Sequence, residues 1–201
     1  IKLKASDANL VEDAMMPKVL RSEAGVLKPK DVANLLACAE DYVLPALAIH
    51  FFAGLRRSEV ERLDWSEINL SEQEIEVKGE KAKGAKRRIV PISDNLCAWL
   101  TPLAQHEGAV IGSGYLYRKG IMKARRDADL VDGYPHNAGR HSYASYHLAK
   151  NKHAGELAVN LGHPDPTMLY SHYRAMVTPK DAATYWSIAP VSLDNVTSIV
   201  S

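Results

Sequence analysis

The sequence is poor in cysteine and lacks a long apolar segment, and both absences limit what the protein can be. Cys38 and Cys97 are the only cysteines among 201 residues, too few for the disulfide framework of a small secreted domain. Both lie in apolar helical patterns, so we expect buried free thiols in a reducing compartment. The most apolar stretch, residues 42–54, contains Pro45 and His50 and falls short of the roughly 20 residues of a membrane-spanning helix. We therefore expect no membrane partner.

The first residues do not have the pattern of a secretory leader, and the chain has no strong net charge. Its first residues, "IKLKASDANLVEDAMM", include acidic residues and no apolar core, so we expect a cytoplasmic protein. The formal net charge is only +1, but residues 78–88 hold six Lys and Arg against one Glu, and residues 117–126 hold five against none. Such runs are usually solvated faces, yet two of them in a nearly neutral chain strengthen the case for a polyanionic partner.

The spacing of apolar residues predicts a mainly α fold with a small antiparallel β-sheet. Asp31 is placed to cap a first helix, and residues 42–54 should form a buried helix that ends at Gly54. Ser58 and Glu61 have the spacing of a capping box for the next helix. "EIEVKG" and "RRIVPI" alternate apolar and polar residues around a Gly- and Lys-rich turn, which predicts a β-hairpin. Further helices are predicted at 94–105, 117–130, 138–150, 154–161, 166–174 and 179–187.

The same patterns divide the chain into three parts. Residues 1–27 are weakly periodic, with breaks at Pro17 and Gly25, and we interpret them as a linker or an N-terminal extension. Residues 28–187 contain the predicted helices and strands and form the main domain. Residues 188–201 are β-branched with little polar periodicity, and we expect a tail that can pair with another subunit.

Two arginines and a tyrosine occur where they could act on phosphate. Arg56 directly follows the buried helix, and Arg140 begins the helix in "GRHSYASYHLAK", where the helix dipole also favours an anion. Tyr173 lies ten residues after His163 in "LGHPDPTMLYSHYR". A phenol has a pKa of about 10, so it needs an electropositive pocket or a base to act as a nucleophile at neutral pH. Taken alone, the first motif fits a structural ion pair from Arg56 to a nearby glutamate equally well.

Together these stretches resemble the tyrosine recombinase (phage integrase) family over residues 28–187, which would be its catalytic domain. "AGLRRSEVERLDWSEINL" resembles the first arginine box of that family, and "RHSYASYHLA" resembles the second. "EVKGEKAKGAKRRIVPI" resembles its lysine-bearing hairpin, and "LGHPDPTMLYSHYR" its closing histidine-to-tyrosine segment. Four such stretches in the family's order argue against a chance similarity.

The resemblance implies an enzyme that breaks and rejoins DNA in recombination or in the integration of a mobile element, with chemistry like that of type IB topoisomerases. Arg56 and Arg140 would hold the scissile phosphate, and His163 would donate a hydrogen bond to it. Tyr173 would attack phosphorus to give a 3′-phosphotyrosine, and Lys83 would protonate the leaving 5′-oxygen. The resemblance implies no metal, no ATP and no other cofactor.

Three of these positions depart from the family pattern or have a rival. Asn137 stands where the family has a histidine, and an asparagine cannot accept a proton as a base. We expect Asn137 to have a positioning role, with His136 as the alternate. Tyr170 is the alternate nucleophile, and Lys81 is the alternate to Lys83.

Other residues are expected to support the site or to contact DNA. His141 and Glu59 should lie beside the catalytic residues. The expected DNA contacts are Lys86, Arg87, Arg88, Lys119 and Lys123. The implied partners are double-stranded DNA and further copies of the chain, assembled as a tetramer on DNA, and the free protein could be a monomer. The resemblance also implies a bacterial or phage-encoded protein associated with the nucleoid.

Two other functions fit parts of the sequence. A metallohydrolase is disfavoured, because His141 and His147 lie six residues apart on different faces of a helix and the sequence has no HExxH motif, so we predict no metal site. A catalytically impaired, integrase-like DNA-binding protein is supported only by Asn137. The first 27 residues are too short for the core-binding domain of the family, so we expect a catalytic fragment or a weak grip on DNA.

Overall fold

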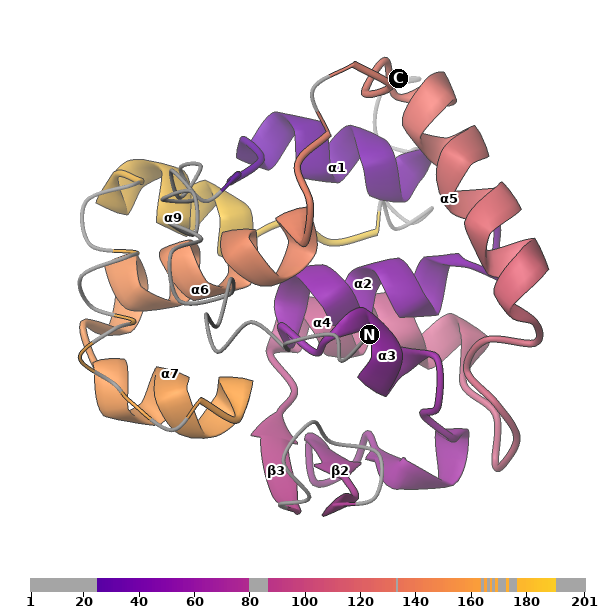
Figure 1. The fold of residues 1–201 in the computed structure, drawn as a ribbon, viewed down its shortest axis with the longest axis horizontal. Helices are drawn as coiled ribbons and strands as arrows, with labels where there is room; N and C mark the ends of the chain where they lie inside the picture. Colours follow the sequence, from indigo (N-terminus) through magenta and orange to yellow (C-terminus); the bar gives the residue numbers. More distant parts are fainter. Residues whose placement is uncertain are drawn as a thin grey trace, which may run out of the picture.

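The computed structural model has a helical body with a small sheet at one end (Figure 1). It describes residues 25–79, 87–132, 134–163, 165, 167, 169, 173 and 177–190. The longer helices are α1 (Pro29–Ala37), α2 (Leu44–Phe52), α4 (Asp94–Leu100), α5 (Gly114–Asp127), α6 (Ala138–Asn151), α7 (Ala154–Leu161) and α9 (Pro179–Trp186). The shorter ones are α3 (Arg57–Val60), η1 (Trp65–Glu67) and η3 (Thr101–Leu103). The predicted fold class is confirmed.

The sheet is a three-stranded antiparallel meander of β1 (Ile68–Asn69), β2 (Glu74–Val77) and β3 (Arg88–Pro91). Ile75 lies opposite Val90, and both are fully buried, because side chains along a strand alternate between its two faces. The predicted hairpin is therefore confirmed for its two strands. β1 was not predicted, since two residues give no periodic signal.

The buried helix α2 lies at the centre of the molecule and packs against α4 on one side and α6 on another (Figure 1). All but two of its nine residues are buried, as the sequence predicts. Gly54 follows it with a φ of +66°, a conformation that favours glycine. A Cβ at Gly54 would also lie 2.4 Å from Cδ1 of Tyr143, so the turn brings α2 close to α6.

Two helix starts differ from the sequence prediction. The first helix begins at Pro29 with Lys28 as its N-cap, so Asp31 lies in the first turn, where its charge still favours the helix dipole. The capping box of Ser58 and Glu61 is wrong, because α3 begins at Arg57. The glutamate that caps it is Glu59, whose carboxylate accepts a hydrogen bond from the backbone N–H of Arg56.

Several helix ends also differ from the prediction. α4 ends at Leu100 and continues only as the 3₁₀ turn η3, which contains Pro102, although a helix was predicted to run to residue 105. α5 begins three residues early, where Ser113 Oγ accepts a hydrogen bond from the N–H of Leu116. α6, α7 and α9 match their predicted ranges within one residue. In the range 166–174 the described residues are Thr167, Leu169 and Tyr173, and all three are helical.

The packed body extends beyond both predicted boundaries of the main domain, to Val26 at one end and Ile188 at the other. Leu27 is buried, its N–H donates to Ser142 Oγ at 3.1 Å, and its carbonyl accepts from the Tyr146 hydroxyl at 2.9 Å. At the other end, the carbonyl of Ile188 accepts from Nε1 of Trp99 at 3.1 Å. Most of the predicted extension and tail lie outside the described residues.

Cys38 and Cys97 are unpaired and only partly buried, not fully buried as expected. Across the described part of the chain, no helix has the length and apolar character needed to span a membrane.

Candidate active site

Arg56 and Glu59 form the first half of the site, at the junction of α2 and α3. Nη1 of Arg56 lies 3.0 Å from Oε1 of Glu59, and the Arg56 N–H donates to Oε2 of the same carboxylate at 2.8 Å. Glu59 is 1% exposed, whereas the Arg56 side chain is 24% exposed. The ion pair that the sequence offered as an alternative for Arg56 therefore exists, and it holds an arginine that still reaches the surface.

A second arginine, Arg88 of β3, binds the same carboxylate. Its Nη1 and Nη2 donate to Oε1 and Oε2 of Glu59 at 3.0 and 2.8 Å, a two-pronged pairing that suits a guanidinium. Arg88 is 8% exposed. The expected DNA contact from Arg88 is therefore wrong, since β3 turns this side chain inward and its guanidinium is used inside the protein.

The Glu59 carboxyl is ionised in this setting. Burial acts to raise its pKa, but hydrogen bonds from Arg88 and from the Arg56 N–H, together with the two guanidinium charges, outweigh burial. The pKa of Glu59 consequently lies below its ordinary value. Two elements far apart in sequence, β3 and the start of α3, are joined by this buried ion pair.

The last turn of α7 is the common anchor of three arginines. Nε of Arg88 donates to the carbonyl of Asn160 at 2.9 Å, and Nη2 of Arg140 donates to that of Leu161 at 2.7 Å. Nη2 of Arg56 donates to the carbonyl of Gly162 at 3.3 Å. The last carbonyls of a helix have no partner within it and carry the negative end of its dipole, so they attract cations.

The second half of the site begins with Arg140 of α6, and this arginine contacts the segment just before Arg56. It lies in the first turn of α6, and its Nη1 donates to the carbonyl of Gly54 at 2.8 Å. Burial, together with the nearby charge of Arg56, lowers the pKa of Arg140 to about 10, so the guanidinium keeps its charge at neutral pH. Two of its five N–H groups are used by these carbonyls, and the others suit phosphate oxygens.

His163 is placed next to this arginine group by the end of α7. Gly162 ends the helix with a φ of +60°, and the N–H of His163 then donates to the carbonyl of Ala158 at 2.8 Å. This left-handed ending turns the chain out of the helix axis. His163 therefore directly follows the three carbonyls that hold the arginines.

Tyr173 contacts the residue that follows Arg140. Its hydroxyl lies 2.7 Å from Nδ1 of His141, with the two ring centroids 5.8 Å apart. Burial raises the pKa of Tyr173, and the charge of Arg140 acts in the opposite direction. The structure thus places His141 beside the tyrosine that the sequence favoured, and the alternate Tyr170 lies outside the described residues.

Asn137 and His136 are exposed and precede α6. Asn137 has a φ of +55°, a conformation that asparagine tolerates better than most residues. Both side chains line a cavity of about 360 Å³ that also reaches Arg140, Arg57 and Tyr117.

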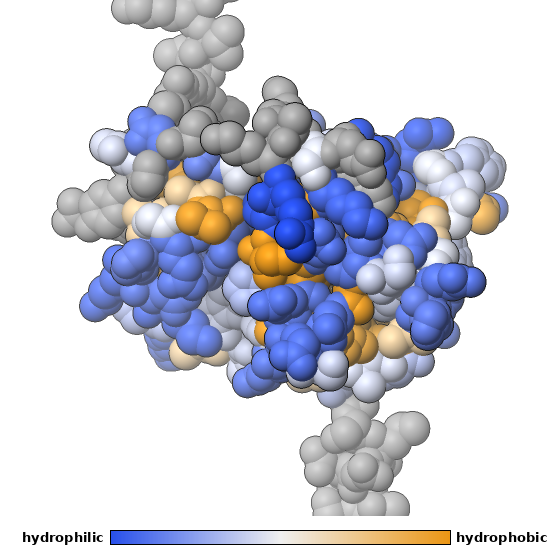
Figure 2. Space-filling view, turned by 90° about the horizontal axis from the view of Figure 1, so that it is seen from below, coloured by the Kyte–Doolittle hydropathy of each residue, from blue (hydrophilic) through white to orange (hydrophobic). Residues whose placement is uncertain are grey.

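The remaining basic residues that the sequence predicted as catalytic lysines or DNA contacts fall into two groups, those outside the described residues and those on the surface. Lys81, Lys83 and Lys86 lie outside the described residues. Arg87 is exposed and pairs with Glu76. Lys119 and Lys123 lie on the exposed face of α5, where Lys123 pairs with Asp127 at 2.8 Å and with Glu40 at 3.3 Å. Figure 2 shows one face of the molecule from below, with hydrophilic residues around smaller apolar areas.

The sequence analysis did not identify His50 as part of the site, although its side chain lies close to the residues next to Arg56 and Arg140. Nδ1 of His50 lies 3.0 Å from the carbonyl of Leu55, and Nε2 lies 2.6 Å from the Tyr117 hydroxyl. A Cβ on Gly139 would lie 2.9 Å from Cβ of His50, so α6 approaches α2 closely here. Burial lowers the pKa of His50 to about 4, which leaves the ring neutral at pH 7. The only sequence signal was a polar residue within an apolar helix.

The described residues contain no group of three or more His, Cys, Asp or Glu side chains that could hold a metal ion. His147 is buried, with Nε2 close to Glu156 and Asn151 and its ring against Tyr143 and Trp186. It therefore belongs to the packing of α6.

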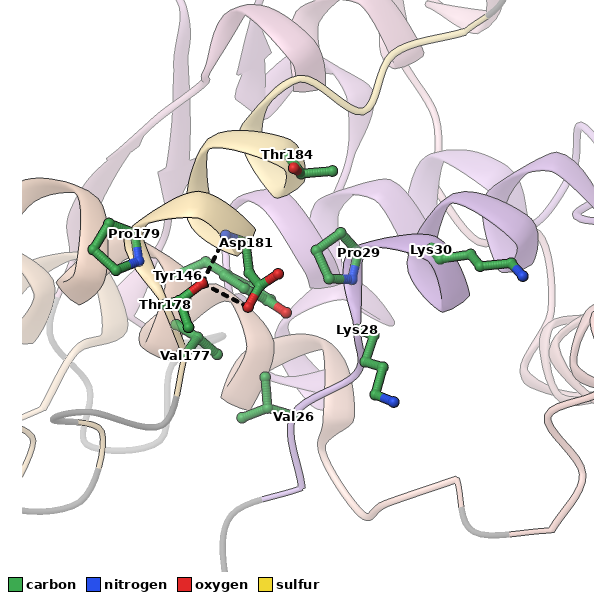
Figure 3. Close-up of a pocket in the computed structure, with 10 residues that line it drawn as sticks. All are labelled: Val26, Lys28, Pro29, Lys30, Tyr146, Val177, Thr178, Pro179, Asp181 and Thr184. Atoms are coloured by element: carbon green, nitrogen blue, oxygen red, sulfur yellow. Dashed lines mark hydrogen bonds between the residues drawn. The ribbon is translucent and has the colours of Figure 1, made fainter.

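A second cavity, of about 920 Å³, lies between the starts of α1 and α9 (Figure 3). Pro29 of α1 faces Asp181 of α9 across it, and Thr178 holds Asp181 by two hydrogen bonds. Val26 and Val177 add apolar surface. Its lining includes neither the arginines nor Tyr173.

The sequence matches the model of the phage integrase family over residues 25–178. That match covers most of the chain and contains the arginine group, His163 and Tyr173. The chain belongs to the phage integrase family.

Curated relatives and solved structures agree with this membership. Tyrosine recombinase XerC of Xanthomonas axonopodis pv. citri is 28% identical over 176 residues, which cover 78% of this chain and 56% of that protein. XerC of Escherichia coli O1:K1 / APEC is 27% identical over 206 residues, covering 90% and 67%. This integrase-family chain spans about half the length of several of the curated relatives it matches.

Two solved recombinases share the fold. The crystal structure of XerA recombinase matches with a TM-score of 0.62 and 18% identity, over 77% of this chain and 62% of the other. The XerH site-specific recombinase bound to its difH substrate, in a pre-cleavage complex, matches with a TM-score of 0.59 and 17% identity, over 89% and 59%.

Proposed function

We propose that the chain is the catalytic part of a site-specific DNA recombinase that cuts and rejoins DNA through a 3′-phosphotyrosine, without metal or ATP. One observation carries this proposal: Arg56, Arg140 and His163 surround the end of α7, and Tyr173 contacts the residue next to Arg140. Membership of the phage integrase family supports it. Its named relatives come from bacteria, and we place this protein on bacterial or phage DNA in the cytoplasm.

In this reaction the arginines stabilise charge that develops on the phosphate. Arg56 and Arg140 keep their carbonyl partners and offer their remaining N–H groups to non-bridging phosphate oxygens, and His163 donates a hydrogen bond to the same group. The Tyr173 oxygen forms a bond to phosphorus as the bond to the 5′-oxygen breaks. By the family resemblance, Lys83 gives that oxygen its proton and Asn137 positions the phosphate. Lys119, Lys123, Arg87 and Lys86 remain our proposed contacts to the DNA backbone.

The test is a covalent adduct on a nicked suicide duplex. A site is first selected from a random-sequence pool by binding to the full chain, and the reaction is then run in EDTA and resolved on a denaturing gel. We expect an adduct with the wild type and with Tyr170→Phe, and none with Tyr173→Phe. No adduct from wild-type protein on a bound site would reject the recombinase proposal, and the reverse pattern for the two tyrosines would make Tyr170 the nucleophile.

A second function is favoured by Asn137 alone. Because this residue cannot act as a base, the chain could be an integrase-like DNA-binding protein with impaired catalysis. Binding of the selected duplex without any adduct over long incubation is the result that this alternative requires.

For assembly we propose a tetramer on paired duplexes, in which the tail of one subunit docks on the next. The acceptor we propose is the cavity between α1 and α9, whose apolar residues Val26, Pro29 and Val177 suit a β-branched segment (Figure 3). The sequence after Pro190, "VSLDNVTSIVS", is such a segment, and four residues separate it from the end of α9.

A further inference from the structure

The proposed reaction needs an acceptor for the tyrosine proton, and this inference rests on that reaction. A phenol that attacks phosphorus must lose its proton, and burial of Tyr173 keeps that proton on the oxygen at neutral pH. The position where the family has a histidine holds Asn137, which has no acceptor nitrogen of that kind. A different group must then take the proton.

His141 occupies the place such an acceptor requires. Its Nδ1 is 2.7 Å from the Tyr173 hydroxyl, within the range for direct proton transfer. The residue lies in the first turn of α6, directly after Arg140, so the helix that carries a phosphate-binding guanidinium also carries this imidazole.

Two other candidates among the residues that the structure describes, Glu59 and His136, are engaged or exposed. The carboxylate of Glu59 is bound by Arg88 through both oxygens and by Arg56 through its side chain and backbone N–H. His136 is exposed and lines the cavity in front of α6.

We propose that His141 is the catalytic proton acceptor for Tyr173 and takes over the role left open by Asn137. Nδ1 of the neutral ring, in the tautomer with hydrogen on Nε2, accepts the phenolic proton as the bond from Tyr173 Oη to phosphorus forms. The bond from phosphorus to the 5′-oxygen breaks, and that oxygen receives a proton from the general acid of the proposed reaction. On rejoining, the His141 imidazolium returns its proton to Oη as the tyrosine leaves.

The first test compares His141→Gln with wild type on the selected nicked duplex, with the rate of adduct formation as the readout. Glutamine can still hydrogen-bond the phenol but cannot take its proton, so we expect a rate lower by about 10² to 10⁴. His147→Gln is the matched control, since this histidine lies on the same helix and packs away from the tyrosine hydroxyl. We expect it to lower the melting temperature while the adduct rate stays within about threefold of wild type.

The second test asks whether a new base restores the rate. We expect free imidazole to restore adduct formation in His141→Ala, and Asn137→His to restore it in the His141→Gln background. The melting temperature of each variant shows that it is folded.

The outcomes separate the proposals. No adduct from the wild type rejects the recombinase function itself. A normal rate in His141→Gln, beside an active wild type, overturns this inference alone. A loss that neither imidazole nor Asn137→His reverses also overturns it, because His141 would then hold the tyrosine in place without accepting its proton.

Discussion

Glu59 is the residue on which the first half of the site depends most. One carboxylate, 1% exposed, receives two guanidinium groups and a backbone N–H. Removing a single partner of a buried ion pair leaves the remaining charges without compensation, which costs far more than losing a surface pair. The side chain thus stabilises the fold and orients Arg56 at once.

We expect Glu59→Gln to lower the free energy of unfolding by about 3 kcal/mol, because Arg88 stays buried without its counter-ion. Urea denaturation measures the loss. Glu61→Gln is the control: its pair with Arg57 lies at the surface, so its loss should stay below about 1 kcal/mol. Equal stability of the two variants would contradict the importance assigned to the buried pair.

His50 should make the stability depend on pH. Its pKa in the folded protein is about 4, below the value of 6.5 for an unperturbed histidine. The unfolded chain therefore takes up a proton first as the pH falls, so this stabilisation is complete above about pH 7 and is lost progressively down to about pH 4. We expect the free energy of unfolding to fall by about 2 kcal/mol over that range. This figure allows for partial exposure of the ring to solvent.

The measurement compares urea denaturation of wild type and His50→Gln between pH 7.5 and 4. The difference between the two proteins should shrink as the pH falls. Parallel pH profiles would show that His50 titrates alike in the folded and unfolded states.

At the scale of elements, the end of α7 organises the site. Three successive carbonyls receive Arg88, Arg140 and Arg56, and the left-handed Gly162 then leads the chain to His163. A Cβ at Gly162 would lie 3.2 Å from Nη1 of Arg88, so the turn also permits a close approach. One short helix thereby fixes residues from β3, α6 and the start of α3.

Gly162→Ala should destabilise the protein by about 1–2 kcal/mol, because a residue with a Cβ is strained at this φ. It should also slow adduct formation, since the Arg88 guanidinium must move. Gly155→Ala, in the first turn of the same helix, is the control. Its nearest contact would be an ordinary 3.5 Å to His153, so we expect little change in thermal unfolding or adduct rate. Similar effects of the two variants would argue against a special role for the helix end.

The sequence predicted some parts of this site much better than others. Arg56, Arg140, His163 and Tyr173 lie in short motifs that can be found locally in the sequence, and the resemblance to the family implied their roles. Arg88 was misplaced because it closes a basic run, and only the pairing of β3 with β2 decides which strand face turns inward.

The pairing of His141 with Tyr173 joins segments 32 residues apart. Such a contact depends on how α6 packs, which local patterns do not specify. The sequence could place His141 near the site but could not give its partner.

At the scale of the whole molecule, the helical body presents two separate features. The arginine group gathers around the end of α7 and Tyr173 contacts the first turn of α6, while the larger cavity lies between α1 and α9. The proposed catalysis and the proposed subunit docking can therefore be altered independently, which makes the assembly proposal testable while the candidate active site stays intact.

Deletion after Pro190 should abolish DNA-dependent tetramers and leave binding to a single site, because the acceptor cavity then has no occupant. Val177→Asp should also abolish the tetramers, because it places a charge among the apolar residues that line the cavity. Native gels and light scattering with the selected duplex measure both, and the wild type is the reference. Tetramers that persist after the deletion would contradict tail docking. If tetramers are lost on deletion but persist in Val177→Asp, the tail docks at a site other than this cavity.

The arginine anchors at the end of α7 are main-chain atoms, and this changes which mutations the site can tolerate. The side chains at 160–162 can vary, within the limits of packing and of the glycine turn, without removing an anchor. The length of the helix cannot vary in the same way. One inserted residue would rotate the helix end by about 100° and advance it by about 1.5 Å, which would carry all three carbonyls away from their arginines together.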